Sequence, residues 1–258
     1  PPPPPRSRAA RRRPTALIVE GTRAGDGRRV TEEEVAERAL RGVKEAAGRL
    51  VIADFGPRNV ERLVLFLEVA RLTGRALAIT PRDAYLLRAI HLIDEEVPDV
   101  ASSKELRIYQ KTRADASPDL WQRGICEEHA DRVVLADQVR RSPGDYILCF
   151  SFFDLNELPS LPRGGLYLYS SSEPHDEEEA IDFRRLHRWL EHFGMEGVGL
   201  PREASPGRWE IPIELVRRVR PRVVIPVHSE DPGYFRQQLR DAGMEVCLPE
   251  RGRPIVIG

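Results

Sequence analysis

Cysteine is scarce in this sequence, and the few cysteines are scattered. They are Cys126, Cys149 and Cys247, an odd number at wide spacing, and two of them lie in apolar runs. This distribution excludes a disulfide framework and a zinc site built on cysteines. It is typical of a protein of the reducing cytoplasm, so we expect a cytoplasmic location.

Long apolar runs and an excess of charge of one sign are also lacking. No run approaches the length of a membrane-spanning helix and no signal-peptide segment is found, so we expect no membrane partner. The net charge is −1, which excludes a global positive field that would draw the chain to nucleic acid. Lysine occurs only at positions 44, 104 and 111. The arginines that supply the remaining positive charge suit phosphate contacts, or they reflect genome composition alone.

The remaining composition is that of a globular protein, with 41% apolar and 31% charged residues over 258 positions. Short apolar runs alternate with amphipathic segments, which predicts an α/β protein with a parallel sheet and right-handed crossovers. We expect strands at residues 15–20, 49–54, 75–80, 106–109, 146–150, 166–169, 222–227, 245–248 and 254–257. We expect helices at residues 31–47, 57–72, 81–91, 119–128, 131–139, 177–193, 213–219 and 234–242.

Two of the predicted strands end in polar side chains that suit chemistry. The strand at residues 15–20 ends in Glu20, and the strand at residues 222–227 is followed by His228. Ligands of α/β proteins gather beyond the carboxyl ends of the strands, where His228 is suited to bind a metal or to act as a base. The alternative is a hydrogen-bonded structural histidine, which is the more frequent role of a single histidine at a strand end.

The first 13 residues form a separate segment. Five prolines precede a cluster of five arginines, a composition that predicts an extended tail of polyproline type. Such a tail is a basic arm that binds RNA, a solvated terminus or the end of a truncated helix.

The two strand ends and the segments between them resemble the second half of a metallo-β-lactamase-fold nuclease of the β-CASP group. This group includes RNase J and the cleavage factors of mRNA 3′-end processing. Leu17-Ile-Val-Glu20-Gly-Thr22 is similar to the family segment in which an acidic residue ends a strand. Pro221-Arg-Val-Val-Ile-Pro-Val-His228-Ser-Glu230 is similar to the family's final metal-binding motif. Residues 54–62 resemble a helix start in the family's inserted cap, and residues 169–172 resemble the cap's small-residue loop.

The resemblance implies an α/β architecture in which a β-CASP cap is inserted into a partial metallo-β-lactamase fold. The cap is expected to be a parallel sheet with flanking helices. Residues 1–13 are then the tail, residues 14–30 and 201–258 are the two metallo-β-lactamase segments, and residues 31–200 are the cap. RNA is the implied partner, with a second copy of this chain as a further candidate.

The implied chemistry is metal-dependent hydrolysis of RNA. Two Zn²⁺ ions about 3.5–4 Å apart would activate a water and brace the scissile phosphate. By this resemblance His228 would ligate one zinc ion through a ring nitrogen. Glu20 would be a carboxylate that orients a metal ligand and tunes the charge of the site.

Five residues are assigned to substrate binding: Ser170, Ser171, Ser172, Arg58 and Glu203. The serine loop would donate hydroxyl or backbone N–H hydrogen bonds to a phosphate, or it is an ordinary strand-to-helix connection. Arg58 would contact a phosphate from a helix start, or it is a surface or packing residue. Glu203 is the nearest polar residue to the place where the family often has a histidine that positions the scissile phosphate.

Two departures from the family pattern bear on activity. The family's defining His-x-His-x-Asp-His motif is absent, which leaves His228 as the only expected zinc ligand, and the histidine near Glu203 is missing. We therefore expect a zinc-dependent ribonuclease that is complete only with an N-terminal half absent from this chain, and that is inactive without it. The alternatives are a catalytically degenerate β-CASP-like scaffold and a metallo-hydrolase for a small molecule. The sequence pattern does not distinguish an RNA substrate from a DNA substrate, or an endonuclease from an exonuclease.

Overall fold

The computed structural model describes residues 14–21, 32–56, 58–112, 120–170, 177–200, 211–229 and 232–257. The chain divides into unit 1, formed by Pro1–Glu32 and Glu203–Gly258, and unit 2, formed by Glu33–Arg202. The boundaries expected from the sequence are 30/31 and 200/201, and the family identity of each unit stays a prediction. The tail at residues 1–13 lies outside the described residues. No helix in the described ranges combines the length and the apolar character needed to cross a membrane.

Both units are α/β, with each strand parallel to its neighbours, as the sequence pattern predicts. The strands are β1 (Ala16–Glu20), β2 (Val51–Asp54), β3 (Ala76–Ile79), β4 (Leu106–Tyr109), β5 (Val133–Val134), β6 (Tyr146–Cys149), β7 (Gly165–Tyr169), β8 (Met195–Gly199), β9 (Val223–Val227) and β10 (Glu245–Val246). The α-helices are α2 (Glu32–Glu45), α3 (Val60–Thr73), α4 (Pro81–His91), α5 (Leu120–Glu128), α6 (Ala136–Arg141), α7 (Glu177–Phe193), α8 (Ile211–Val219) and α9 (Pro232–Gln238). Short 3₁₀ helices are η1 (Ala130–Arg132), η2 (Pro143–Asp145), η3 (Phe152–Ser160) and η4 (Arg240–Ala242).

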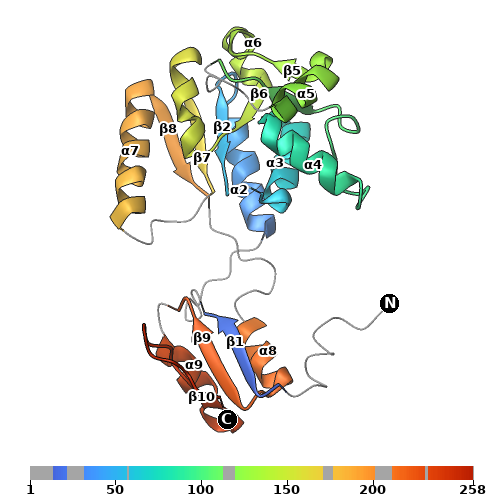
Figure 1. Cartoon of the computed structure of the whole chain (residues 1–258). Helices are drawn as coiled ribbons and strands as arrows, with labels where there is room; N and C mark the ends of the chain where they lie inside the picture. The colour runs from blue at the N-terminus through green and yellow to red at the C-terminus, as the bar shows by residue number, and fades with distance from the viewer. Residues whose placement is uncertain are drawn as a thin grey trace. The chain divides into compact units, whose positions relative to one another are not determined.

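Unit 2 is a seven-stranded parallel sheet covered by helices (Figure 1). The strand order is β5-β4-β3-β6-β2-β7-β8. The central strand β2 is buried at every position, as expected for a parallel sheet with both faces covered. At β8, Val198 faces a cavity shared with α2, whereas Gly197 faces Leu190 of α7, so α2 and α7 lie on opposite faces.

The helices of unit 2 begin and end where local side chains satisfy the backbone. The Asn59 side chain accepts a hydrogen bond from the Arg62 amide at the start of α3, and Gly74 ends this helix with φ at +69°. At α4, the Thr80 hydroxyl accepts from the Asp83 amide, and the Asp83 carboxylate accepts from the Thr80 amide. These caps fix where the loops after β2 and β3 stop.

Unit 1 is a three-stranded parallel sheet in the order β1-β9-β10. Helix α8 contacts β1 and α9 contacts β9. Pro226 lies in the middle strand although proline cannot donate to a ladder. β10 pairs only with Val223 and Val224, so the ladder on that side has ended before Pro226. The Gly21 amide bonds to the Val227 carbonyl on the β1 side, which directs the nitrogen of Pro226 away from β1.

Two expectations about local structure are wrong, and one strand was not expected. Residues 131–139 do not form one helix, because Val133–Val134 pair with β4 as a short edge strand between η1 and α6. Residues 254–257 form no strand, since Pro254 lacks an N–H and no described residue pairs with this segment. The strand β8 was not expected, because Met-Glu-Gly-Val-Gly contains two glycines and a single β-branched residue.

Candidate functional site

The two strand ends selected from the sequence lie next to each other in unit 1. β1 and β9 are parallel neighbours, side by side in Figure 1, and their register pairs Glu20 with Val227. The Gly21 amide donates a hydrogen bond to the Val227 carbonyl at 2.8 Å. Glu20 and His228 therefore lie at the carboxyl ends of adjacent strands, which is where α/β proteins gather functional side chains.

Gly21 packs closely against residues that follow His228 in the sequence. A Cβ atom at position 21 would lie 2.9 Å from Ser229 Cβ and 2.7 Å from the ring of Phe235. The Phe235 side chain is fully buried in α9 and belongs to the core of unit 1. Only glycine fits between the two strand ends. This requirement was not predicted, although the sequence shows the glycine directly after Glu20.

The backbone turns sharply at His228. Its φ is +50°, a left-handed conformation that costs a non-glycine residue of order 1–3 kcal/mol and that clusters at functional sites. The side chain of His228 is exposed. The next residue, Ser229, has a buried Oγ atom without a hydrogen-bond partner. Buried unsatisfied groups are rare and call for an explanation, and this one lies one residue from the predicted metal ligand.

These side chains do not make a complete metal site. Among the described residues, no group of three or more His, Cys, Asp and Glu side chains is arranged to hold a metal ion. A catalytic zinc ion takes three protein ligands and leaves one position open. The described residues therefore do not fit a bound pair of zinc ions, and further ligands would have to come from other residues.

The residues assigned to the substrate belong to unit 2. Ser170 follows β7, and its amide donates to the Asp54 carbonyl at the end of β2 at 2.7 Å. The Ser170 Oγ atom is buried and has no hydrogen-bond partner. Arg58 is exposed in the connection between β2 and α3, with φ at +70°. Ser171, Ser172 and Glu203 lie outside the described residues.

A set of buried polar bonds holds the carboxyl ends of the strands of unit 2. The Tyr167 hydroxyl donates to the Asp54 carboxylate at 2.6 Å, and both side chains are buried. Burial, together with the charge of Asp54, raises the pKa of Tyr167 well above its usual value, so the phenol keeps its proton and remains a donor. Asp154 accepts from the Ser151 amide at 2.8 Å and pairs with Lys111 at 2.5 Å. The Tyr167–Asp54 and Lys111–Asp154 pairs could not be predicted from the sequence, because each joins segments that are distant along the chain.

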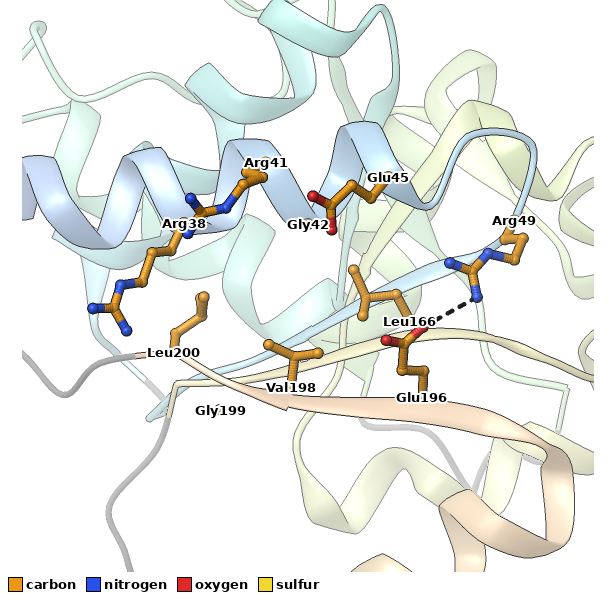
Figure 2. A pocket seen from close by; sticks show the side chains of 10 residues that line it. All are labelled: Arg38, Arg41, Gly42, Glu45, Arg49, Leu166, Glu196, Val198, Gly199 and Leu200. Carbon is orange, nitrogen blue, oxygen red and sulfur yellow. Dashed lines mark hydrogen bonds and ion pairs between the residues drawn. The ribbon is translucent and has the colours of Figure 1, made fainter.

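A cavity of about 210 Å³ lies between α2 and the edge strand β8 (Figure 2). One wall carries Arg38 and Arg41 from α2, and the other carries Glu196 and Val198 from β8. Arg49 bonds Glu196 across the cavity at 3.4 Å. Arg41 makes no hydrogen bond or ion pair with a described residue. The full lining is Arg38, Arg41, Gly42, Glu45, Arg49, Leu166, Glu196, Val198, Gly199 and Leu200.

The comparisons with known proteins bear on the fold. The chain matches no family model and no curated protein. It is similar to the crystal structure of a protein of unknown function from Enterococcus faecalis V583, with a TM-score of 0.63 and 20% sequence identity. The match covers 96% of this chain and 53% of that one, so this chain spans about half the length of that protein. Similarity at this level of identity shows a shared fold alone.

Proposed function

We propose that this chain is the C-terminal part of a metallo-β-lactamase-fold nuclease of the β-CASP group. It would be a metal-dependent phosphodiester hydrolase that acts on RNA and is complete only with an N-terminal half absent from this chain. Unit 1 would then be the partial metallo-β-lactamase fold and unit 2 the β-CASP cap. The observation that carries the proposal is the adjacency of Glu20 and His228 at the ends of β1 and β9.

The proposed roles follow from the chemistry of these two side chains. An exposed imidazole suits zinc ligation in its neutral form, and His228 is exposed at a strand end. A carboxylate beside a ligating group fixes the orientation of that group, and Glu20 lies on the neighbouring strand. The remaining ligands would come from the absent half, so the chain alone is expected to be inactive.

The unpaired edge of β1 supports the proposal that a further strand lies beside it in the complete protein. Among the described residues, β1 pairs only with β9. Its residue Ile18 is 67% exposed, although strands of parallel sheets are normally buried on both faces. An exposed apolar edge strand is a template for pairing with another strand. In this proposal a strand of the absent half covers that edge.

The test extends the chain upstream of Pro1 by the residues that its gene encodes there. Bound zinc and cleavage of a labelled single-stranded RNA are then measured. We expect the extended protein to bind zinc and to cut the RNA, and we expect His228→Ala to lose both properties. His192→Ala, at an exposed histidine of α7, is the matched control and is expected to keep both. An extended protein that neither binds zinc nor cuts RNA contradicts the proposal.

A catalytically degenerate scaffold is the second candidate. It is favoured by the lack of a three-ligand group among the residues that the structure describes. In that case the extended protein folds and binds RNA but holds no zinc. A metallo-hydrolase for a small molecule would instead hold zinc without cutting RNA, so the same two measurements separate all three functions.

A further inference from the structure

The two edges of the seven-stranded sheet differ in length and exposure. The edge at β5 consists of Val133–Val134, which leaves little backbone for pairing. The edge at β8 runs over Met195–Gly199 and pairs along its whole length with β7. No strand among the described residues covers the other side of β8, and its last four residues are exposed.

The outward-pointing backbone groups of β8 follow from its bonds to β7. The Leu200 amide donates to the Tyr169 carbonyl at 2.8 Å, so the backbone of Leu200 points toward β7. The N–H and C=O groups of successive residues in a strand point alternately to its two sides. Met195, Gly197 and Gly199 therefore direct their N–H and C=O groups away from the sheet.

This edge lacks the features that keep natural edge strands from pairing. β8 contains no lysine or proline, and its pairing with β7 is continuous, without a bulge. Its one charged side chain, Glu196, is drawn back to its own chain by the ion pair with Arg49. The apolar Val198 is 37% exposed. The edge can therefore accept another strand.

We propose that β8 pairs with β8 of a second copy of this chain, antiparallel about a two-fold axis at Gly197. Under this symmetry Gly197 lies opposite the partner's Gly197, and Met195 lies opposite the partner's Gly199. All of these residues direct their hydrogen-bonding groups outward, so each opposite pair exchanges two backbone hydrogen bonds. The interface uses the same surface twice, as closed two-fold dimers do.

The side chains of β8 fit this symmetry on both faces of the sheet. On the α7 face the two-fold axis passes through Gly197, so no side chain of β8 meets its own copy there. Leu190 of α7 covers this position, 3.3 Å from where a Cβ of residue 197 would lie. On the α2 face Glu196 lies opposite the partner's Val198, which avoids two like charges directly opposite each other.

The test is the mass of the full chain in solution, with two variants of Gly199. Gly199→Pro removes an outward N–H, and proline is tolerated in an edge strand at a position whose N–H faces solvent. Gly199→Ala is the matched control, since it keeps the N–H and its Cβ meets no atom within 4 Å. Light scattering at tens of micromolar is expected to give twice 29.3 kDa for the natural chain and for Gly199→Ala. Gly199→Pro is expected to give 29.3 kDa.

A natural chain with the mass of one copy overturns the proposal, and so does a Gly199→Pro variant that remains dimeric. Circular dichroism establishes whether Gly199→Pro is folded. If it is not, hydrogen exchange of the natural chain replaces it. The amides of Met195–Gly199 are expected to exchange about tenfold more slowly at high than at low protein concentration. Exchange rates that do not change with protein concentration also overturn the proposal. Neither measurement involves metal or RNA, so the result is independent of the proposed nuclease function.

Discussion

Replacing Gly21 with alanine tests whether the ends of β1 and β9 depend on each other. The added methyl group would lie 2.7 Å from the Phe235 ring and 2.9 Å from Ser229 Cβ. Carbon atoms at optimal separation lie about 3.5–4.0 Å apart, so one of these neighbours has to move. Phe235 is fully buried in the core of unit 1, and Ser229 follows the left-handed turn at His228. Neither can move without disturbing the strand end or the core.

The expected cost is that of overpacking. Inserting a methyl group into a well-packed core costs about 1–3 kcal/mol, and we take about 2 kcal/mol for the free energy of unfolding of unit 1. That change raises the unfolded fraction roughly 30-fold. Hydrogen exchange of the amides of Val223, Val224, Ile225 and Val227 reports on unit 1 separately, and in Gly21→Ala these amides are expected to exchange roughly 30-fold faster.

Gly124→Ala is the matched control for this change. A Cβ at Gly124 in α5 meets no atom within 4 Å, so alanine is expected to stabilise unit 2 by about 0.4–1 kcal/mol and to leave exchange in β9 unaltered. Unchanged protection of β9 in Gly21→Ala would refute the argument that the two strand ends are packed against each other.

Two further predictions concern unit 2. The buried Arg75 guanidinium donates to four backbone carbonyls at 2.8 to 3.5 Å. Because a hydrogen bond from a charged group contributes about 1.5–3 kcal/mol and the four bonds share one guanidinium, Arg75→Met should lower the free energy of unfolding in urea by at least about 3 kcal/mol. The exposed Arg71→Met should change it by less than about 0.5 kcal/mol, and equal effects would contradict the assignment. Burial raises the pKa of Asp99, but hydrogen bonds from Ser102 and two nearby histidines outweigh burial and lower it below 3.8. The stabilisation that comes from a lowered pKa is complete above the ordinary value and is lost as the pH falls through the lowered one, so Asp99→Asn should reduce the melting temperature more at neutral pH than near pH 3. An equal reduction at both pH values would show that Asp99 does not act through its charge.

The elements that could be predicted from the sequence are those whose pattern is local. The helix α7 has the predicted bounds 177–193, because its apolar residues recur at helical spacing. The strands β1 and β9 are predicted by their apolar runs, and only the family resemblance implies that Glu20 and His228 belong to one site.

The elements that could not be predicted depend on contacts between distant segments. β8 is a strand because β7 lies beside it, not because of the composition of Met195–Gly199. Val133–Val134 form a strand for the same reason, at the end of the ladder with β4. In the candidate site, the need for glycine at position 21 arises from Phe235, which comes from the far end of the sequence. The Tyr167–Asp54 bond likewise joins two strands that no local pattern relates.

The pairing of β1 with β9 has a consequence for how the chain folds. These neighbours come from opposite ends of the described residues, with the whole of unit 2 between them. Closing an unstructured loop of roughly 200 residues costs about 5 kcal/mol, and a folded unit 2 removes most of this cost by fixing its own two ends. During synthesis β1 is made before unit 2 and β9 after it, so the side of β1 that pairs with β9 stays unpaired while unit 2 forms. A substitution that slows the folding of unit 2 should therefore lengthen the time for which β1 is not paired with β9. It should lower the yield of native protein, even when it lies far from Glu20 and His228.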